Sequence, residues 1–439
     1  MNSDAVISPQ TIKEGVVTIT IVEGTVAEIN ITGTDHLNPN YVKDRLELAI
    51  GTPLDLNELL EALRLLQIDP VIENISAELA RGVRPEASIL NVTVTEANTF
   101  DLSAFANNGR SPSVGSFRRG VSLYHGNVFG LADKFNFAWA NTDGSDSFDG
   151  SYAIPINARN GEIILTAGYR DTEIIEEPFN RLDILGDSVY YELTYRQPIV
   201  QSATKEFALG LTFSRQESST EVLDTPFPLS RGADEEGETK ISAIRLFQEY
   251  IKRNPRDVFA LRSQFNIGVD VFDASDEEGF PDSNFLSWRG QGQYVRLLDR
   301  DTLFVVRTEI QLATDELLAL EQFSLGGFNS VRGYRQDFLL TDNAFFASAE
   351  VRIPLLRAPE VEGLLQIIPF IDFGVGWNNG IIPDPDPNAI AGIGVGLQWQ
   401  MGDRLDARID FGVPLTDTNI EERTWQENGI YFNINYKLF

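Results

Sequence analysis

Residues 326–338, GGFNSVRGYRQDF, combine three glycines with two arginines in a stretch that is neither alternating nor helical. A planar guanidinium binds a carboxylate through two parallel hydrogen bonds, so such a stretch can fasten a loop to an acidic side chain. Gly326, Gly327 and Gly333 would allow the tight backbone that this arrangement needs. The chemistry indicated is therefore ion pairing by Arg332, and the alternative is that Arg332 is an ordinary solvated loop residue.

Catalytic and metal-binding chemistry has little support in the composition. The chain has no cysteine, and its two histidines, His36 and His125, are far apart in sequence, which argues against a thiolate site, a histidine metal site or a catalytic triad. No Gly-x-Ser-x-Gly elbow and no phosphate-binding motif occur in the sequence. Lys+Arg is 35 and Asp+Glu is 65, and the formal net charge of −30 argues against a nucleic-acid partner. We therefore expect no enzyme, no cofactor, no metal, no nucleic acid and no nucleotide.

Residues 98–439 are a succession of segments of ~9–12 residues in which apolar and polar side chains alternate, as in membrane-spanning strands. In FALRSQFNIGVD (259–270), Phe265 lies on an apolar face and Gln264 on a polar one. About sixteen such segments occur, joined by alternately short and long connections, a pattern typical of outer-membrane barrels. The chain has no run of ~18 apolar residues, which excludes a membrane helix. We predict a mainly β fold, a 16-stranded antiparallel transmembrane β-barrel; a soluble sandwich or propeller is the alternative.

The same alternation supplies acidic partners for Arg332 on the inner face of this barrel. The relevant inward-facing positions on two late strands are Glu350, Phe370, Asp372 and Gly374. A long external loop near residues 313–341, folded back into the lumen, would bring Arg332 to Asp372, with Glu350 as a second partner. Paired lumen carboxylates are also able to do acid–base chemistry, but charge-lined lumens are normal in barrels.

Residues 25–97 differ in character and predict a small α+β domain of the order β-α-α-β-β. Its helical segments, NPNYVKDRLELAIG and DLNELLEALRLLQID, are amphipathic and begin at capping residues. The octet VTITIVEG (17–24) is similar to LNVTVTEA (90–97), one domain length later. Residues 1–24 are therefore interpreted as the remnant, ending in the last strand, of a preceding copy of this domain. The alternative is a coincidence of two β-rich octets.

Together these features resemble the superfamily of polypeptide-transport proteins, in which periplasmic POTRA domains precede a sixteen-stranded outer-membrane barrel. Two motifs carry the resemblance. The Val-Arg-Gly-Tyr/Phe motif of the sixth external loop is matched by Val331, Arg332, Gly333 and Tyr334. The Phe-x-Asp-x-Gly motif of a late strand is matched by Phe370, Asp372 and Gly374. The flanking EQFSLGGFNSVRGY and FFASAEVRIP resemble the two-partner secretion translocators, the haemolysin secretion/activation family.

The resemblance implies a translocator in the outer membrane of a Gram-negative-type bacterium. It would recognise an unfolded exported partner, a large β-helical protein, and secrete it through the lumen while the barrel contacts outer-membrane lipids. The even strand number and the short turns place the POTRA domain and both chain ends in the periplasm. Members usually have two POTRA domains and an N-terminal plug helix, whereas one POTRA domain is complete here. An insertase that assembles other barrels is the alternative function; a passive porin is disfavoured because porins lack POTRA domains.

First contact with the partner is expected on the POTRA domain, by addition of a strand to an exposed sheet edge. The candidate edge residues are Ile75, Ala77 and Leu79. The groove beside the second helix, at Leu59 and Leu63, is the other candidate surface.

Overall fold

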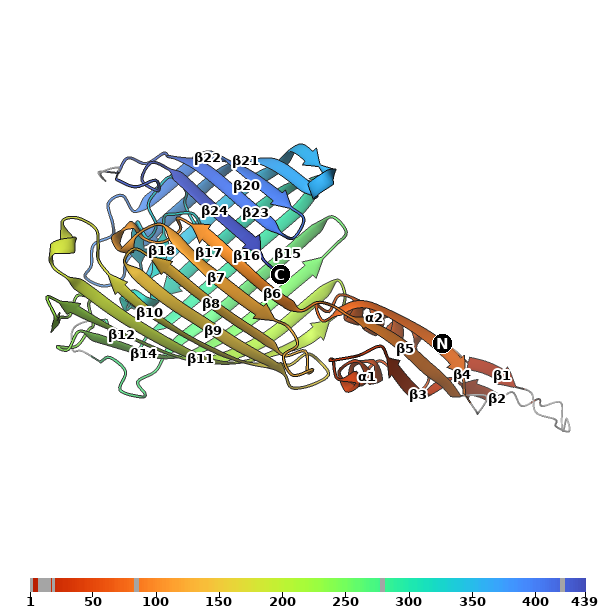
Figure 1. The fold of residues 1–439 in the computed structure, drawn as a ribbon. Coiled ribbons are helices and arrows are strands. Elements are labelled where there is room, and N and C mark those ends of the chain that lie inside the picture. The colour runs from red at the N-terminus through yellow and green to blue at the C-terminus, as the bar shows by residue number, and fades with distance from the viewer. Residues whose placement is uncertain (1–2, 7–16, 18–19, 83–86, 277–280, 419–422) are drawn as a thin grey trace.

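The computed structural model describes residues 3–6, 17, 20–82, 87–276, 281–418 and 423–439. It consists of a closed β-barrel with a small mixed α/β domain attached at one end (Figure 1). The small domain comes first in the chain, and a two-stranded ribbon lies beyond it, farthest from the barrel. No helix among the described residues is long and apolar enough to cross a membrane.

Sixteen long antiparallel strands form the barrel, with the two-residue strand β13 (Thr225–Pro226) as an appendage of β12. Pairing of the last strand with the first closes it. The long strands are β6 (Phe100–Asn107), β7 (Arg118–His125), β8 (Lys134–Thr142), β9 (Ser145–Pro155), β10 (Glu162–Glu173), β11 (Ile184–Gln201), β12 (Lys205–Val222), β14 (Glu238–Arg253), β15 (Asp257–Gly268), β16 (Leu286–Asp299), β17 (Thr302–Ala313), β20 (Asn343–Ala358), β21 (Gly363–Trp377), β22 (Ala389–Met401), β23 (Leu405–Pro414) and β24 (Ile430–Lys437). The predicted fold is confirmed.

Alternation along the strands separates a lipid-facing surface from the lumen. In β15 the side chain of Phe265 is 42% exposed on the outer wall, whereas the next residue, Asn266, is 3% exposed. Some strands are longer than the sequence predicts, 18 residues in β11 and in β12, because the ladder continues past the apolar stretch into polar residues such as 214–221.

Connections between barrel strands are short at the end next to the small domain and mostly long at the other end. Short turns at the first end include residues 254–256, 300–301 and 402–404. Long loops at the second end include residues 174–183, 223–237, 314–342 and 415–429. The connection between β8 and β9, only residues 143–144, is the exception at the second end. The predicted alternation of short and long connections is therefore present in the barrel, with the β8–β9 connection as the exception.

The small domain has the predicted order β-α-α-β-β. Its elements are β3 (Thr25–Thr32), α1 (Pro39–Glu47), α2 (Leu56–Gln67), β4 (Ile72–Arg81) and β5 (Ala87–Glu96). The sheet order is β3-β5-β4, with β3 parallel and β4 antiparallel to β5. Both helices begin at side chains that accept a backbone N–H, Asn38 for α1 and Asp55 for α2. Leucines of the helices pack on valines of β5 to form the core.

At the start of the chain, β1 (Ser3–Val6) pairs antiparallel with β2 (Thr20–Glu23). The sequence predicted only the second of these strands. An antiparallel pair is also what β4 and β5 form, so residues 1–24 stay interpreted as the remnant of a preceding domain, and the boundaries at residues 25, 97 and 98 stay predictions. Residues 7–16 and 18–19 lie outside the described part. The remaining short elements are η1 (Pro112–Val114), η2 (Phe179–Arg181), η3 (Ala319–Glu321), η4 (Pro359–Val361), β18 (Phe323–Leu325) and β19 (Leu339–Thr341).

Candidate functional site

The connection between β17 and β20, residues 314–342, folds into the barrel; we call it loop 6. Its strands β18 and β19 pair with each other, and the segment between them reaches the wall formed by β20 to β23. Arg332 is only 1% exposed, which is inconsistent with an ordinary solvated loop arginine. Val331 and Tyr334 are also buried, packed among apolar side chains that include Leu325 and Ile390.

Arg332 and Asp372 meet in the fork geometry that the sequence suggested. The Nε of Arg332 donates to Oδ2 of Asp372 at 2.7 Å, and Nη2 donates to Oδ1 at 2.9 Å. The backbone N–H of Arg332 donates to the same carboxylate at 3.1 Å. Asp372 lies on β21 with no exposed surface, so its charge is balanced within the protein.

The other proposed wall residues surround the same guanidinium. Arg332 lies over the ring of Phe370, 3.4 Å from its centroid, at cation–π distance. Its Nη1 is 3.3 Å from Oε2 of Glu350 on β20. Gly374 provides space rather than a contact atom, because a methyl group there would lie 2.9 Å from Cγ2 of Val331.

Three charged residues at this site were not singled out from the sequence. Asp410 on β23 accepts from Arg332 at 3.3 Å, and Arg408 bonds both Asp410, at 3.0 Å, and Glu350, at 2.9 Å. Arg352 also donates to Glu350, at 2.8 Å. Three guanidiniums thus face three carboxylates, and the formal charges of these six residues cancel; the carboxylates and Arg332 are buried, whereas Arg352 is 28% exposed. The members of this cluster, here called the Arg332 cluster, are Arg332, Glu350, Arg352, Asp372, Arg408 and Asp410.

Glycines on β22 and β23 let the loop backbone approach the wall. A methyl group on Gly392 would lie 2.0 Å from the carbonyl oxygen of Arg332, and one on Gly412 would lie 2.7 Å from the nitrogen of Gly333. Gly333 itself has a φ of 107°, which other residues rarely adopt. The motif glycine is therefore required by backbone conformation, and the wall glycines by close approach.

Two tyrosines complete the attachment of the motif. The hydroxyl of Tyr431 on β24 accepts the N–H of Gly333 at 2.8 Å and donates to the carbonyl of Tyr334 at 2.7 Å. The hydroxyl of Tyr334 in turn donates to the carbonyl of Ala391 at 2.7 Å. Tyr431 was missed, although the alternation of β24 places it on the lumen face.

The outer part of loop 6 is tied to two other long loops. Arg335 donates to both oxygens of Glu176, at 2.8 and 2.7 Å, and to Glu427 at 3.2 Å. The hydrogen bonds from Arg335 hold the pKa of the Glu176 carboxyl below its usual range, and the same bonds raise the pKa of Arg335.

The proposed partner-binding residues lie on the small domain. Ile75, Ala77 and Leu79 are on β4, an edge strand of the described sheet; Ala77 is exposed, and the other two are half-buried against the core. Leu59 is 5% exposed and packs with Leu63 against the domain's own sheet. Leu59 therefore belongs to the core and not to an open groove.

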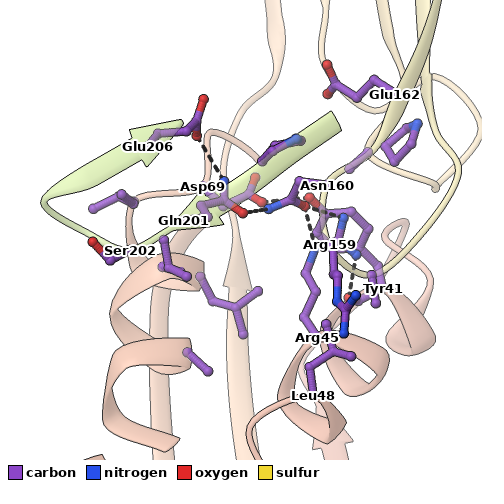
Figure 2. A pocket seen from close by; sticks show the side chains of 18 of the residues that line it. Tyr41, Arg45, Leu48, Asp69, Arg159, Asn160, Glu162, Gln201, Ser202 and Glu206 are labelled. Atoms are coloured by element: carbon purple, nitrogen blue, oxygen red, sulfur yellow. Dashed lines mark hydrogen bonds between the residues drawn. The ribbon is translucent and has the colours of Figure 1, made fainter. Parts of the chain in front are cut away.

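The small domain docks on the short turns of the barrel and forms with them an open pocket of about 770 Å³ (Figure 2). Arg45 of α1 donates to Oδ1 of Asn160 in the β9–β10 turn at 2.6 and 2.9 Å. The Tyr41 hydroxyl donates to Asp69 at 2.6 Å. Burial, and then the Asp69 carboxylate, raise the pKa of Tyr41, and burial lowers the pKa of Arg45. Among the described residues, no group of three or more side chains fits a metal ion.

The family model "Haemolysin secretion/activation protein ShlB/FhaC/HecB" matches residues 86–399. The outer membrane transporter CdiB of Escherichia coli is 23% identical over 428 residues, which cover 94% of this chain and 70% of CdiB. The heme/hemopexin transporter protein HuxB of Haemophilus influenzae is 20% identical over 440 residues, which cover 95% of this chain and 74% of HuxB.

Solved structures show the same fold. The structure of CdiB from Escherichia coli has a TM-score of 0.80 at 19% identity, covering 99% of this chain and 80% of that one. BamA from Haemophilus ducreyi, lacking POTRA domains 1–3, has a TM-score of 0.64 at 12% identity, covering 100% and 90%. Because the family match covers well over half of the sequence, this chain belongs to the haemolysin secretion/activation family, whose members are outer-membrane transporters of two-partner secretion.

Proposed function

We propose that this chain takes up one unfolded partner protein in the periplasm and secretes it through the barrel lumen. Family membership supports transport as the activity, and both CdiB and HuxB are named as transporters. The resemblance of the sequence to two-partner secretion translocators supports a large β-helical partner. Outer-membrane lipids cover the apolar outer wall.

The observation that carries the proposal is the position of loop 6. Its Arg332 is held in the lumen by a charge-balanced cluster whose carboxylates are buried. A polypeptide conduit has to stay closed between substrates, and a loop that is fastened by polar contacts is an obstruction that can be removed and restored. The Arg332 cluster is therefore proposed to hold the closed state, and movement of loop 6 to open the route.

The orientation follows from the asymmetry of the barrel. Outer-membrane barrels carry short turns on the periplasmic side and long loops outside. Here the small domain docks on the short turns, and the carboxyl-terminal end lies beside β6, where the N–H of Leu438 donates to the carbonyl of Leu102 at 2.7 Å. We place the POTRA domain and both ends of the chain in the periplasm on this basis.

The first contact with the partner is assigned to the edge of the POTRA sheet. The strand β4 pairs on one side with β5 and has no second neighbour within the described sheet. An extended segment of the partner can add to that edge through backbone hydrogen bonds, with Ile75, Ala77 and Leu79 setting the register. Leu59 and Leu63 are not assigned a direct contact with the partner, because they pack α2 against the sheet of its own domain.

An insertase that assembles other barrels is the second candidate. The likeness to BamA favours it, because the two chains share the complete fold. At 12% identity this likeness concerns the fold alone, whereas the family match concerns the sequence.

Co-expression with a large exported β-helical protein from the same genome, chosen first from the genes beside this one, tests the proposal. The amount of that protein in the culture medium is compared between cells with and without the transporter. We expect release that depends on this chain, with unchanged levels of other outer-membrane barrels when it is removed. Periplasmic retention of the exported protein in both strains, together with a loss of other barrels, would instead favour the insertase.

A further inference from the structure

Loop 6 has a second attachment, on a different part of the barrel wall. Glu321, at the end of η3, binds Arg245 on β14 through two hydrogen bonds, Nη2 to Oε1 at 2.6 Å and Nη1 to Oε2 at 3.1 Å. The side chain of Glu321 is 6% exposed and that of Arg245 is 11% exposed. The Arg332 cluster, on β20, β21 and β23, includes neither residue, so the two attachments are separate.

The segment around Glu321 is held by packing as well as by charge. Leu317 and Leu318 are buried in an apolar cluster with Ile241 of β14 and with Phe285. The side-chain amide of Gln311 donates to the backbone carbonyl of Glu321 at 2.9 Å. This half of loop 6 therefore has a defined position on the wall.

From Arg245, a line of hydrogen bonds runs along the lumen wall toward the POTRA domain. Nη1 of Arg245 donates to Oδ1 of Asn266 at 3.1 Å, and the amide of Gln264 donates to the same oxygen at 2.7 Å. Arg262 donates to Oε1 of Gln264 at 2.8 Å, and its Nη1 donates to Glu249 at 2.6 Å.

The line continues to the short turns of the barrel. Arg196 donates to Glu249 at 2.8 Å and also to Glu206. The side-chain amide of Gln201 donates to Oε2 of Glu206 at 3.1 Å. Asn160 donates to Oε1 of Gln201 at 2.8 Å.

The last link joins the barrel to the POTRA domain, because Oδ1 of Asn160 accepts from Arg45 of α1. Figure 2 shows this end, with Arg45, Asn160, Gln201 and Glu206 in sequence beside the pocket. We call the whole line the polar row. Its members are Arg45, Asn160, Gln201, Glu206, Arg196, Glu249, Arg262, Gln264, Asn266, Arg245 and Glu321.

The direction of the bonds makes the row sensitive to the docking of the POTRA domain. Arginine is only a donor and a carboxylate only an acceptor, so Arg45 at one side and Glu206 at the other fix the orientation of the two amides between them. Without Arg45, the amide of Asn160 loses the donor that sets its orientation, and Gln201 loses its fixed partner. Both amides are half-buried, so an unpaired polar group there costs free energy and the neighbours rearrange.

We propose that Arg245 and Glu321 are positioning residues for loop 6 and that the polar row couples the docking of the POTRA domain to the position of this loop. A POTRA domain that is displaced by an incoming partner would weaken the second attachment of loop 6 through the row. Loop 6 has two states, attached to the wall or released from it. The contact of Arg45 at one end of the row and that of Glu321 at the other both favour the attached state. The inference adds to the proposed function but is measured without any partner.

Distance measurements between two spin labels test this coupling. The chain has no cysteine, so the substitutions Ala319→Cys in loop 6, two residues from Glu321, and Arg300→Cys in a short turn create two unique labelling sites. Ala319 is exposed, and Arg300 has an 83% exposed side chain. Double electron–electron resonance on the full chain in lipid vesicles then reports the position of loop 6. Heat-modifiable migration on gels shows that each variant forms the barrel.

The informative variants are Asn160→Ala and Glu321→Gln. The parent should show one distance between the two labels, and each variant should show a second population at another distance. In the double variant this second population should be no larger than in the stronger single variant. The matched control is Glu61→Gln, which removes the charge from another contact between α2 and a short turn, the 2.8 Å bond from the N–H of Ala203, outside the polar row. It should leave the distance unchanged.

An unchanged distance in a folded Asn160→Ala variant would overturn the coupling, as would an equal change in Glu61→Gln. An unchanged distance in a folded Glu321→Gln variant would overturn the second attachment. None of these outcomes bears on secretion, so a failure here is distinguishable from a failure of the proposed function.

Discussion

The guanidinium of Arg332 and the carboxylate of Asp372 meet through two parallel hydrogen bonds of 2.7 and 2.9 Å, and neither side chain is more than 1% exposed. One residue comes from a loop at the end of the barrel opposite the POTRA domain, and the other from a wall strand, β21. Their pairing fixes loop 6 inside the lumen. Removing one member of a buried pair leaves the other charge unbalanced, at a cost of about 3–5 kcal/mol where burial is deep.

The wall glycines give a steric test of the position of loop 6. Gly392→Ala places a methyl group 2.0 Å from the carbonyl oxygen of Arg332, so the loop has to move away from the wall. We expect larger pore currents in planar lipid bilayers from this variant. Gly150→Ala is the control, because a methyl group there has no heavy atom nearer than 3.9 Å. Identical currents from Gly392→Ala and the parent would contradict the placement of the loop.

The lipid-facing assignment predicts different costs for the same substitution at adjacent positions of β11. Leu193 is 50% exposed on the outer wall, whereas Thr194 faces the lumen and shares a hydrogen bond with Thr212. Leu193→Arg should destabilise the folded barrel by up to ~2–4 kcal/mol, the cost of an arginine at the bilayer midplane. Thr194→Arg should cost less. Unfolding by urea in lipid vesicles measures both, and equal losses would reverse the assigned faces.

The contact between Arg335 and Glu176 predicts a pH dependence at the end of the barrel opposite the POTRA domain. Because the folded-state pKa of Glu176 is lowered, its contribution is present above the ordinary value of 4.5 and is lost as the pH falls through the folded pKa. Pore currents should therefore be constant from neutral pH to about 5 and rise only in stronger acid. At neutral pH the Glu176→Gln variant should already show the larger current that the parent reaches only in strong acid. A transition in the parent near pH 7 would point to a different group.

Several parts of this molecule were predictable from the sequence because alternation decides which face a strand residue occupies. Asp372, Phe370 and Glu350 were found in this way, and the Val-Arg-Gly-Tyr motif gave Arg332. Alternation does not decide which residues of different strands lie side by side. The alternation of β23 places Asp410 on the lumen face, but its contact with Arg332 depends on the register across β22.

The polar row could not be predicted from the sequence for a related reason. Its links join residues of four strands, the β9–β10 turn, the helix α1 and η3 of loop 6, and no local pattern brings them together. Around Arg245 the alternation is also weak, since Ser242 and Ala243 are both buried. In the POTRA domain the apolar stripe of α2 was recognised correctly. A stripe alone does not show whether a helix packs on its own sheet or lines a groove for a partner. Leu59 packs on the sheet of its own domain.

Deletion of residues 1–97 tests the role of the POTRA domain in transport. The barrel closes through its own strand pairs, so it should still insert and keep its heat-resistant migration on gels. Ala132 of the β7–β8 turn, which packs in the POTRA core, becomes exposed but belongs to no barrel strand. Release of the partner into the medium should stop. Undiminished release would remove the POTRA domain from the mechanism.

The central claim, that the pairing of Arg332 with Asp372 holds loop 6 in a position on which transport depends, is tested most directly by a double-mutant cycle. Secretion of the partner is measured for Arg332→Ala, Asp372→Ala and the combination, with barrel formation checked on gels. Each single variant should reduce secretion without preventing insertion. The double variant should be no worse than the worse single variant, because one interaction is lost only once. Additive defects would show that the two residues act independently and would contradict the account.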